Sequence, residues 1–428
     1  MTTAASPEGP KRADEASSFI ALNECCRAIR GVTFPSAEAK AEPFAGSIPC
    51  LTTSAVQDEV AWETARHIPD CYMRSIEQEI QAGDLLVSTA NSKVLVGKLA
   101  LARVVPQRMT FGAFVTVLRP LENVLPIYLF LALRSDSARR YFFERSSETT
   151  NISNLRTEDL LAFEIPLPSL GEQERIAGWV SRGIEAAFVA RRAALGRLAA
   201  AEALPNSLLR EVFGESPPFD ASPLTPSEPT NPGWRWHRLA SLARLATGHT
   251  PSRRCPEYWD GGNIPWIQLP DIRALDGRIA MDTIEHTNAL GIENSAAVLL
   301  PAGTVCLSRT ASVGFVTIMG RDMATSQDFV NWVCGPALVP EFLMLVFVAS
   351  RQCIRDLGSG AVHQTIYFPT VKQFSVCVPP VDQQRRIAAD LSARLAAAER
   401  VIARCREELA DIEATPAALL RVAFNGAF

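Results

Sequence analysis

Polar side chains gather in three short segments in the second half of this chain. Residues 247–254 combine a glycine with hydroxyl groups and two arginines, residues 307–312 hold Arg309 among serines and a threonine, and residues 361–365 contain Gln364. Arginine donates a planar pair of N–H groups, whereas threonine and glutamine make single hydrogen bonds. Such groups suit phosphate oxygens and base edges, although a loop arginine is more often only solvated.

The chain lacks the patterns of the common catalytic sites. A Walker A loop is missing, as is the Asn/Asp-Pro-Pro-aromatic motif of amino-methyltransferases, and residues 358–362 lack the third glycine of a dinucleotide loop. Neither Pro69-Asp70 nor Pro270-Asp271 is followed by the acidic-x-Lys pair of a nuclease, and the five histidines form no helical metal pair. We therefore nominate no catalytic and no metal-binding residue, and we do not expect an enzyme.

Composition and charge place few limits on the partner. The 428 residues carry 42 Lys and Arg against 46 Asp and Glu, and the formal net charge of −4 does not by itself indicate a nucleic-acid-binding protein. Residues 1–18 contain no apolar signal segment and no run of 18 apolar residues occurs, so we expect a cytoplasmic protein without a membrane partner. Ten scattered cysteines without a CxxC pair indicate buried free thiols.

Short strands and helices are expected to position the polar segments. The first half has predicted strands at 48–51, 83–89 and 111–118 and a predicted helix over 126–145, and the second half has a corresponding helix over 340–356. Each half is expected to hold one mixed domain, built on one plan with a different surface. The corresponding segments are Ile48-Pro-Cys-Leu with Ile264-Pro-Trp-Ile, Ala82-Gly-Asp-Leu with Ala302-Gly-Thr-Val, and Gly31-Val-Thr with Gly248-His-Thr.

A stretch of 49 residues occurs twice, at 165–213 and at 376–424. Shifted by 211 positions, the two copies match at 17 positions without a gap, where chance would give only a handful. The chain is therefore predicted to be a tandem repeat of one variable domain and one helical segment. The identical pairs include Pro168/Pro379, Gln173/Gln384, Arg175/Arg386, Ile176/Ile387, Pro205/Pro416 and Phe213/Phe424.

Each copy is predicted to form one long helix with a single apolar stripe, which steps by three or four residues as a seam against a partner helix does. Arg191 is the one interruption. Pro205 and Pro416 are predicted to end the long helices, because an interior proline removes a hydrogen bond. We expect the two helices to pack on each other; the alternative is that each packs only on its own domain. The second stripe consists of Ile387, Leu391, Leu395, Ala398, Ile402, Cys405, Leu409 and Ile412.

These features give the predicted domain boundaries. Six prolines keep residues 214–233 out of helices and central strands, so this segment is predicted to be a semi-extended linker. The predicted order is a disordered N-terminus at 1–17, a first variable domain at 18–164, a helical region at 165–213, the linker at 214–233, a second variable domain at 234–375 and a second helical region at 376–428.

The repeated Pro-x-x-x-x-Gln-x-Arg-Ile-Ala, the long helix and the closing Leu-Leu-Arg-x-x-Phe resemble the conserved regions of the specificity subunit of type I restriction-modification systems. The resemblance extends over nearly the whole chain beyond the first 17 or so residues. It implies an α+β fold with two tandem target-recognition domains, each followed by a conserved helix, and the two helices packed as an antiparallel coiled coil about a pseudo-twofold axis.

The resemblance also implies a function. Members of this family are non-catalytic DNA-binding subunits, in which each recognition domain contacts one half of a bipartite, asymmetric site and the helices fix the spacer. The expected partners are double-stranded DNA, two methyltransferase subunits and the restriction/translocase subunits, and S-adenosylmethionine, ATP and Mg are expected in those partners. Two alternatives remain open: a related Type II or methylation-only system, and a repeat-built adaptor that binds proteins.

DNA contacts are then expected from the polar loop residues, and partner or helix-pair contacts from the repeated helices. The residues nominated for DNA contact are Arg30, Thr33, Thr89, Asn91, Lys93, Thr150 and Asn151 in the first domain and Thr250, Arg253, Arg254, Arg309 and Gln364 in the second. The residues nominated for the helix pair or partner subunits are Gln173, Arg175, Ile176, Gln384, Arg386, Ile387, Leu391, Ile402 and Leu409.

Overall fold

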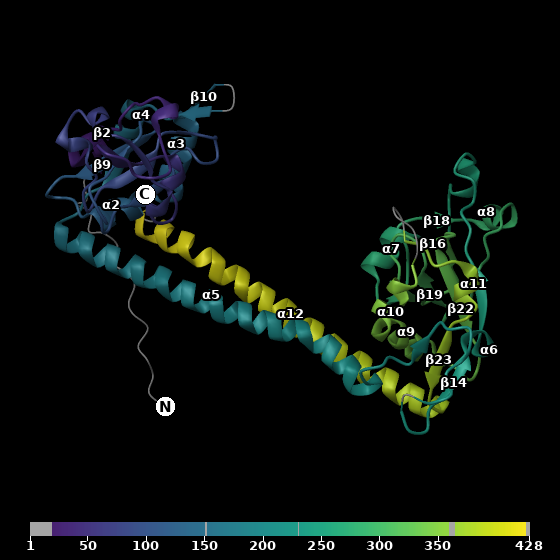
Figure 1. Cartoon of the computed structure of the whole chain (residues 1–428). Coiled ribbons are helices and arrows are strands. Elements are labelled where there is room, and N and C mark those ends of the chain that lie inside the picture. Colours follow the sequence, from purple (N-terminus) through teal and green to yellow (C-terminus); the bar gives the residue numbers. More distant parts are fainter. Residues whose placement is uncertain (1–18, 150–151, 230, 359–363, 425–428) are drawn as a thin grey trace. The chain divides into compact units, whose positions relative to one another are not determined.

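The computed structural model describes residues 19–149, 152–229, 231–358 and 364–424 (Figure 1). Internal contacts divide the chain into two compact units. The first unit comprises the residues up to Leu195 together with those from Glu407 onward, and the second comprises Gly196–Arg406. The segment 1–17, for which disorder is predicted, lies outside the described residues.

A four-stranded antiparallel sheet of order β2-β9-β5-β7 forms the centre of the first unit. Its strand β5 is buried on both faces: Leu85 and Val87 pack toward helix α2 (Pro126–Leu133), whereas Leu86 packs toward Leu51 and Phe111 of a second sheet, β4-β3-β8. The strands are β2 (Cys26–Arg30), β3 (Ser47–Leu51), β4 (Arg66–Pro69), β5 (Leu85–Ser88), β7 (Leu99–Leu101), β8 (Thr110–Phe111) and β9 (Val115–Pro120).

Two small sheets complete the first unit, β10-β11-β6 and β1-β12. The remaining strands are β1 (Phe19–Ala21), β6 (Ala90–Asn91), β10 (Ser147–Thr149), β11 (Ile152–Asn154) and β12 (Glu164–Pro166). The helices are α1 (Leu22–Cys25), α2 (Pro126–Leu133), α3 (Asp136–Arg145) and α4 (Thr157–Leu161), and the 3₁₀ turns are η1 (Ser36–Glu38), η2 (Thr53–Ala55), η3 (Trp62–Thr64), η4 (Asp70–Tyr72) and η5 (Ile76–Gln78).

Two predicted elements of the first unit are each divided in the structure. The segment 126–145 forms α2 and α3 rather than one helix, because Ser135 has an extended backbone and its hydroxyl accepts a hydrogen bond from Ala138 N, which caps the new helix. The segment 111–118 contributes to β8 and β9, which belong to different sheets.

The second unit has the same plan. Its main sheet has the order β15-β22-β19-β20-β17, and its smaller sheets are β18-β16-β21 and β13-β23-β14. The strands are β13 (Phe219–Asp220), β14 (Arg235–Arg238), β15 (Ala243–Thr247), β16 (Ile264–Ile267), β17 (Ile279–Ala280), β18 (His286–Thr287), β19 (Val305–Ser308), β20 (Val316–Met319), β21 (Ala324–Thr325), β22 (Phe329–Cys334) and β23 (Ser375–Val378). The helical elements are α6 (Leu239–Leu242), η6 (Pro256–Tyr258), α7 (Leu269–Ala274), α8 (Ala289–Glu293), α9 (Pro340–Ala349), α10 (Arg351–Asp356) and α11 (Phe368–Val371).

The correspondence predicted between the two halves is confirmed for the two central sheets of each unit. The order β15-β22-β19-β20 repeats β2-β9-β5-β7, and β18-β16-β21 repeats β4-β3-β8. Gly83 and Gly303 precede the matching strands β5 and β19 with φ of +95° and +82°, a backbone region in which a side chain would be strained. The predicted helix over 340–356 is divided at Ser350, as 126–145 is divided at Ser135.

The prediction that Pro205 and Pro416 end the long helices is wrong. Helix α5 runs over Leu170–Phe213 and α12 over Val381–Phe424, each 44 residues with its proline inside. Residues beyond each proline are buried: Leu209 and Phe213 belong to the core of the second unit, and Leu420 and Phe424 to the core of the first. This packing stabilises the last two turns of each helix more than the missing hydrogen bond destabilises them.

The predicted antiparallel helix pair is confirmed in each unit. In the first unit Arg191 Nε donates to Glu413 Oε1 at 2.8 Å, so the one interruption of the stripe is used in an ion pair across the helices. In the second unit Arg394 Nη1 donates to Glu211 Oε1 at 3.0 Å and Arg406 Nη2 to Glu202 Oε1 at 2.7 Å. Residue numbers rise on one helix as they fall on the other, so the two helices are antiparallel. Because these ion pairs join α5 to α12, the alternative that each helix packs only on its own domain is excluded.

The described part of the proline-rich segment 214–233, for which a semi-extended linker is predicted, consists mainly of bends and turns around one two-residue strand, and it is not a free linker. Its strand β13 pairs with β23, and the carbonyl of Pro218 accepts from Cys377 N at 3.0 Å. Phe219 is only 7% exposed, with its ring centroid 4.9 Å from that of Phe374. Arg238 also donates to the carbonyl of Ser222 at 2.9 Å. The segment is therefore an integral part of the second unit.

Candidate nucleic-acid interface

Four loops of the second unit meet at one end of its main sheet. The loop after β15 carries Thr250, whose Oγ1 donates to Gln327 Oε1 at 2.6 Å in the loop before β22. The loop after β19 carries Arg309, whose Nη2 donates to the carbonyl of Gln327 at 2.9 Å. The segment before α11 joins them, because Ile366 N donates to the carbonyl of Arg309 at 2.9 Å. The structure thus brings two of the nominated residues to one residue that was not nominated: Thr250 bonds the side chain of Gln327, and Arg309 bonds its main-chain carbonyl.

Arg309 is a half-buried residue. Its guanidinium carbon lies 4.9 Å from the centre of the Phe368 ring, and its Nε is buried without an acceptor among the described residues. Gln364, at the edge of the same loop cluster, is exposed and directly follows residues outside the described part of the chain. A stacked guanidinium keeps its planar N–H donors in a fixed orientation, which suits bidentate contacts to guanine or phosphate.

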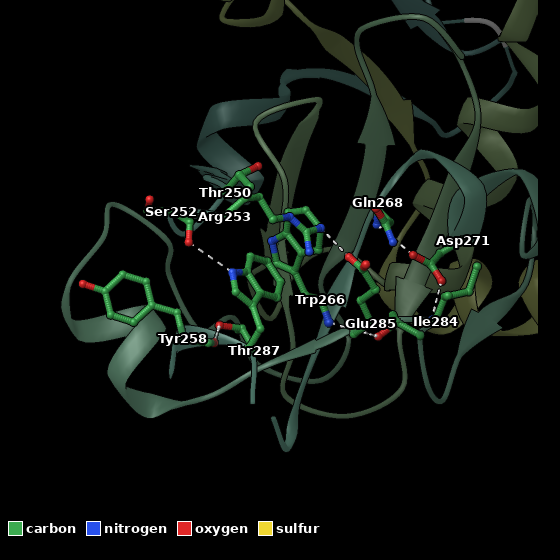
Figure 2. A network of polar contacts seen from close by, with 12 residues as sticks. Thr250, Ser252, Arg253, Tyr258, Trp266, Gln268, Asp271, Ile284, Glu285 and Thr287 are labelled. Atoms are coloured by element: carbon green, nitrogen blue, oxygen red, sulfur yellow. Dashed lines mark hydrogen bonds and ion pairs between the residues drawn. The ribbon is translucent and has the colours of Figure 1, made fainter. Parts of the chain in front are cut away.

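Arg253 forms a second group together with two tryptophans and a glutamate. Its guanidinium carbon lies 3.9 Å from the ring centre of Trp259 and 5.0 Å from that of Trp266. The guanidinium also makes a short ion pair with Glu285, and Figure 2 shows the two side chains pointing toward one another beside Trp266. Arg253 and neighbouring Arg254 are exposed, whereas Trp259 and Glu285 are half-buried. The cation–π contacts stabilise this group and orient the arginine.

Buried polar contacts support this group from behind. Asp271, at the start of α7, is 3% exposed; it accepts from Gln268 N at 3.0 Å and from Ile284 N at 2.8 Å (Figure 2). Trp266 N lies 3.0 Å from Thr283 Oγ1, and Trp266 Nε1 donates to the carbonyl of His249 at 3.3 Å. Asp271 therefore caps a helix and ties it to the next loop, which is a structural role for the Pro270-Asp271 pair.

A charged cluster of Asp282, His286 and Arg321 lies close to this group in the chain fold, and only His286 belongs to a strand, β18. Asp282 Oδ1 lies 2.6 Å from His286 Nε2 and accepts from Arg321 Nη2 at 2.9 Å. The hydrogen bond to His286, together with the backbone of Thr283 and the guanidinium of Arg321, lowers the pKa of Asp282 below its ordinary value. This carboxylate is therefore ionised at neutral pH and faces two basic groups.

The nominated residues of the first unit do not all lie at the surface. Arg30, at the end of β2, and Thr33 are exposed. Asn91 is half-buried, and its Nδ2 donates to Ser88 Oγ at 3.1 Å. The ammonium group of Lys93 lies 5.0 Å from the centre of the Phe143 ring. Two further nominees, Thr150 and Asn151, lie outside the described residues.

Thr89 requires a correction. It is 8% exposed, and its hydroxyl lies 3.2 Å from the carbonyl of Phe114 and 3.3 Å from Thr116 Oγ1. A hydroxyl held inside the sheet in this way is not available to a base edge. Its main chain corresponds to that of Arg309: the Thr89 carbonyl accepts from Leu155 N at 2.8 Å, as the Arg309 carbonyl accepts from Ile366 N. The two units thus place different side chains on the same backbone position.

Gln173 and Gln384, nominated for the helix pair, bind the domains instead. Gln173 is fully buried; its Oε1 accepts from Leu125 N at 2.9 Å, and its Nε2 donates to the carbonyls of Asn123 and Pro168 at 3.0 and 2.9 Å. Gln384 repeats this pattern with Val339 N, Ala337 O and Pro379 O at 2.9, 3.1 and 2.8 Å. The repeated glutamine therefore attaches each long helix to the residues that immediately precede α2 or α9 in its own unit.

The apolar nominees are buried or half-buried along the helices, and the two arginines are exposed. Arg175 makes a short ion pair with Glu172 of its own helix, whereas Arg386 makes no hydrogen bond or ion pair with the described residues. The apolar nominees are Ile176, Ile387, Leu391, Ile402 and Leu409.

Trp259, Glu285 and Gln327 were missed by reasoning from the sequence. Trp259 lies five residues after Arg254 in a loop rich in proline, and an aromatic residue close to loop arginines is a usable signal for a stacked guanidinium. Glu285 and Gln327 come from other loops, so only the tertiary structure brings them to Arg253 and Thr250.

Three further properties of the described part of the chain bear on function. None of its helices combines the length and the apolar composition of a membrane span. It contains no group of three His, Cys, Asp or Glu side chains arranged to hold a metal ion. All ten cysteines fall within it as free thiols, but the prediction that they are buried is wrong for Cys71 and Cys353, which are exposed.

Comparison with known proteins identifies the family. The model of the type I restriction modification DNA specificity domain matches residues 16–185 and 231–402, which together are more than half of the chain. The putative type I restriction enzyme MjaX specificity subunit of Methanocaldococcus jannaschii is 24% identical over 377 residues, 83% of this chain and 82% of that protein. The StySPI specificity subunit of Salmonella potsdam is 22% identical over 416 residues, 93% of this chain and 86% of that protein. The MjaIX specificity subunit of M. jannaschii is 26% identical over 161 residues, so that match spans only 37% of either chain.

Solved structures share the fold. The HsdS subunit from Thermoanaerobacter tengcongensis matches with a TM-score of 0.64 at 19% identity, covering 98% of this chain and all of that one. A chain from a structural study of assembly and conformational transition in a type I R-M system matches with a TM-score of 0.69 at 20% identity, with coverage of 98% and 100%. The resemblance inferred from the repeated helices is confirmed, and the chain belongs to the family of type I restriction-modification specificity subunits.

Proposed function

We propose that this chain is the non-catalytic DNA-binding subunit of its system and recognises a bipartite, asymmetric site, one half with each unit. The observation that carries the proposal is that the two units share one backbone framework but place different side chains on it. Thr89 and Arg309 occupy the same backbone position, and the Arg253 group of the second unit lies in a loop that follows β15 as residues 31–35 follow β2. Two domains with one framework and different loop chemistry suit two different half-sites.

In the second unit, Arg253 and Arg309 are the residues best suited to contact bases or phosphates. Both guanidinium groups stack on aromatic rings, so that their N–H donors are oriented before DNA arrives. A guanidinium that contacts guanine O6 and N7 contributes about 1–3 kcal/mol of discrimination. Glu285 competes for Arg253 in the free protein, and it can instead accept from the N4 amino group of cytosine.

The proposal extends to the partner subunits. Two methyltransferase subunits dock on the chain, one with each repeat, and the restriction/translocase subunits join this assembly. Arg175 and Arg386 support the pairing, because they are exposed at matching positions of α5 and α12. S-adenosylmethionine, ATP and Mg belong to those partners in this proposal, and α5 and α12 determine the number of unspecified base pairs between the half-sites.

The proposal is tested by mapping methylated adenines in cells that carry this chain and its methyltransferase. The expected map is one asymmetric sequence in two parts with a constant spacer. Arg309→Ala should weaken binding to the specific site by about 1–3 kcal/mol and relax one half-site only. Arg244→Ala is the matched control, because Arg244 is exposed on the edge strand β15, away from the loop cluster.

Other outcomes separate the alternatives. If Arg309→Ala lowers affinity equally on all sequences and makes the salt dependence shallower, Arg309 contacts phosphate rather than a base. If methylation is normal but no nuclease subunit binds the complex, the chain serves a methylation-only system. If the purified complex retards random and specific DNA alike, with no methylated sequence in the genome, the protein-binding adaptor replaces the proposal.

A further inference from the structure

Arg253 and Glu285 place hydrogen-bond donors directly beside an acceptor on the second unit. Arg253 Nη2 donates to Glu285 Oε2 in a short ion pair, and the two side chains are 48% and 38% accessible to solvent. Figure 2 shows them pointing toward one another beside Trp266. Because an ion pair between accessible side chains contributes little to stability, the fold alone gives little reason for this arrangement.

Both side chains are held in place by neighbouring residues. The carbonyl of Glu285 accepts from Trp266 N at 3.1 Å and from Thr283 Oγ1 at 2.7 Å. The guanidinium of Arg253 packs on the rings of Trp259 and Trp266, which stand edge to face with their centroids 5.0 Å apart. The donors and the acceptor are therefore positioned before a ligand arrives, which reduces the entropy lost on binding.

A G·C base pair presents the complementary pattern in the major groove of DNA. Guanine offers two adjacent acceptors, N7 and O6, and cytosine offers the N4 amino group as a donor. The O6 and N4 atoms lie about 2.9 Å apart, because they are hydrogen-bonded to each other within the base pair. A guanidinium and a carboxylate that contact one another can therefore face the two bases of a single pair.

Other ligands match this pair of side chains less well. A phosphate group bound to Arg253 would lie beside the carboxylate of Glu285, and the two negative charges would repel each other. A T·A pair offers the guanidinium one acceptor, O4, instead of two, and an A·T pair turns O4 toward the carboxylate. Only guanine at Arg253 with cytosine at Glu285 satisfies both side chains when their ion pair opens.

We propose that Arg253 and Glu285 together recognise one G·C base pair in the half-site of the second unit. This assignment rests on the proposed DNA-binding function and adds the identity of one base pair. In the free protein the two side chains bond each other. On the specific site the ion pair opens, Arg253 donates to guanine O6 and N7, and Glu285 accepts from cytosine N4. On other sequences the ion pair stays closed, so Glu285 also keeps Arg253 from binding phosphate.

Competition binding with altered duplexes tests the assignment. The site is first mapped with the unsubstituted complex, and each base pair of the half-site is then exchanged in DNA offered to the full chain with its methyltransferase. Arg253→Lys keeps the charge but loses the planar pair of donors, so discrimination at one G·C position should fall by roughly 5- to 150-fold. Glu285→Ala should reduce discrimination at the same position by roughly 2- to 10-fold.

The two substitutions should differ on random-sequence DNA. Glu285→Ala should raise the affinity for such DNA and make its salt dependence steeper, because Arg253 is no longer neutralised and can bind a phosphate. Arg253→Lys should not. The matched control is Glu293→Ala, which removes the same charge from an exposed position on α8 of the same unit. This control should leave every base preference unchanged, and relaxation of the G·C position by it would contradict the assignment.

Modified bases test the individual contacts. Replacing the guanine by 7-deazaguanine, which lacks N7, should weaken binding of the unsubstituted complex but not of the Arg253→Lys complex. Replacing the cytosine by an analogue without the N4 amino group should weaken the unsubstituted complex but not the Glu285→Ala complex. Equal weakening of variant and unsubstituted complexes would show that these atoms are not the contacts of Arg253 and Glu285.

The outcomes separate this assignment from the proposed function. A bipartite methylated site whose second-unit half lacks a G·C pair, or in which the two substitutions relax different positions or none, overturns the assignment and leaves the function standing. An equal loss of affinity on all sequences with Arg253→Lys would make Arg253 a phosphate contact and would overturn it as well. If the unsubstituted complex methylates no specific sequence, the function and the assignment fail together.

Discussion

Replacing the buried glutamine of the second repeat tests whether it attaches α12 to its domain. Gln384 is 1% exposed, and it bonds Val339 N, Ala337 O and Pro379 O at 2.9, 3.1 and 2.8 Å. Val339 is the N-cap residue of α9, so the amide satisfies backbone groups at the start of one helix and just before another. Gln384→Ala removes one acceptor and two donors and leaves three backbone groups without their partner.

The expected magnitude follows from this count. Each hydrogen bond contributes about 0.5–1.5 kcal/mol, and a buried group left unpaired costs somewhat more, so the free energy of unfolding should fall by roughly 2–5 kcal/mol. At roughly 2–4 °C per kcal/mol for a unit of this size, the Tm should fall by at least about 4 °C. Gln383→Ala is the control, because Gln383 is exposed on the same turn.

A charge variant separates hydrogen bonding from packing. Gln384→Glu keeps the acceptor for Val339 N but turns a carboxylate toward two carbonyl oxygens, so its folded pKa should be raised. Its stability should then be best at low pH and decrease as pH rises through the raised pKa. Differential scanning calorimetry at several pH values measures both effects. If Gln384→Ala and Gln383→Ala melt within roughly 1 °C of each other, the glutamine does not attach the helix.

Three shorter predictions concern the long helices. Gly183→Val should lower the free energy of unfolding by about 1–3 kcal/mol in chemical denaturation, because a Cβ there would lie 2.6 Å from Leu419 Cδ1. Gly196→Val is the control and should be nearly neutral, since a Cβ at Gly196 has nothing within 4 Å. Equal effects of the two substitutions would contradict close packing of the helices at Gly183. Pro205→Ala should raise the Tm, because alanine restores the hydrogen bond to the Ala201 carbonyl within a continuous helix, and a lowered Tm would show that the proline is needed. The hydrogen bond from Arg394 lowers the pKa of Glu211 below its ordinary 4.5. The stability that this ion pair contributes is therefore fully present above pH 4.5 and is lost as pH falls through the lowered pKa. Acid should then lower the Tm of the unsubstituted chain more than that of Glu211→Gln.

The repeat and the helix pair could be predicted from sequence because their signals are local and periodic. An apolar stripe with steps of three and four residues identifies a helix and its seam without tertiary information, and Ile387, Leu391 and Leu409 all lie on it. The helix ends could not be predicted in the same way. Pro205 is a local signal to stop, but Leu209 and Phe213 beyond it are buried in a core built mainly from distant residues.

The candidate site was less predictable because burial and partners are tertiary properties. Thr89 and Arg309 stand at equivalent sequence positions after matching strands, and nothing in their neighbours tells that one side chain is inside the sheet. Glu285 and Gln327 approach Arg253 and Thr250 from loops at least 32 residues away in sequence. The sequence could indicate which loops carry polar chemistry, but not which side chains in them face one another.

The two units show how such a surface can change its chemistry while the fold is kept. A Cβ at Gly31 would lie 2.2 Å from the Gly112 carbonyl oxygen, and one at Gly248 would lie 2.1 Å from that of Ser326, so both loops need glycine where backbones cross. The positions of Arg309 and Thr89 are held by main-chain hydrogen bonds. Arg309 N donates to Asp328 O at 2.9 Å, and Thr89 N donates to Phe114 O at 3.0 Å. Because these bonds do not depend on the side chain, one unit can place threonine inside the sheet where the other directs arginine over an aromatic ring. Specificity can therefore change at such positions without loss of the framework, whereas substitution at the crossing glycines would disrupt the loops that hold every candidate contact.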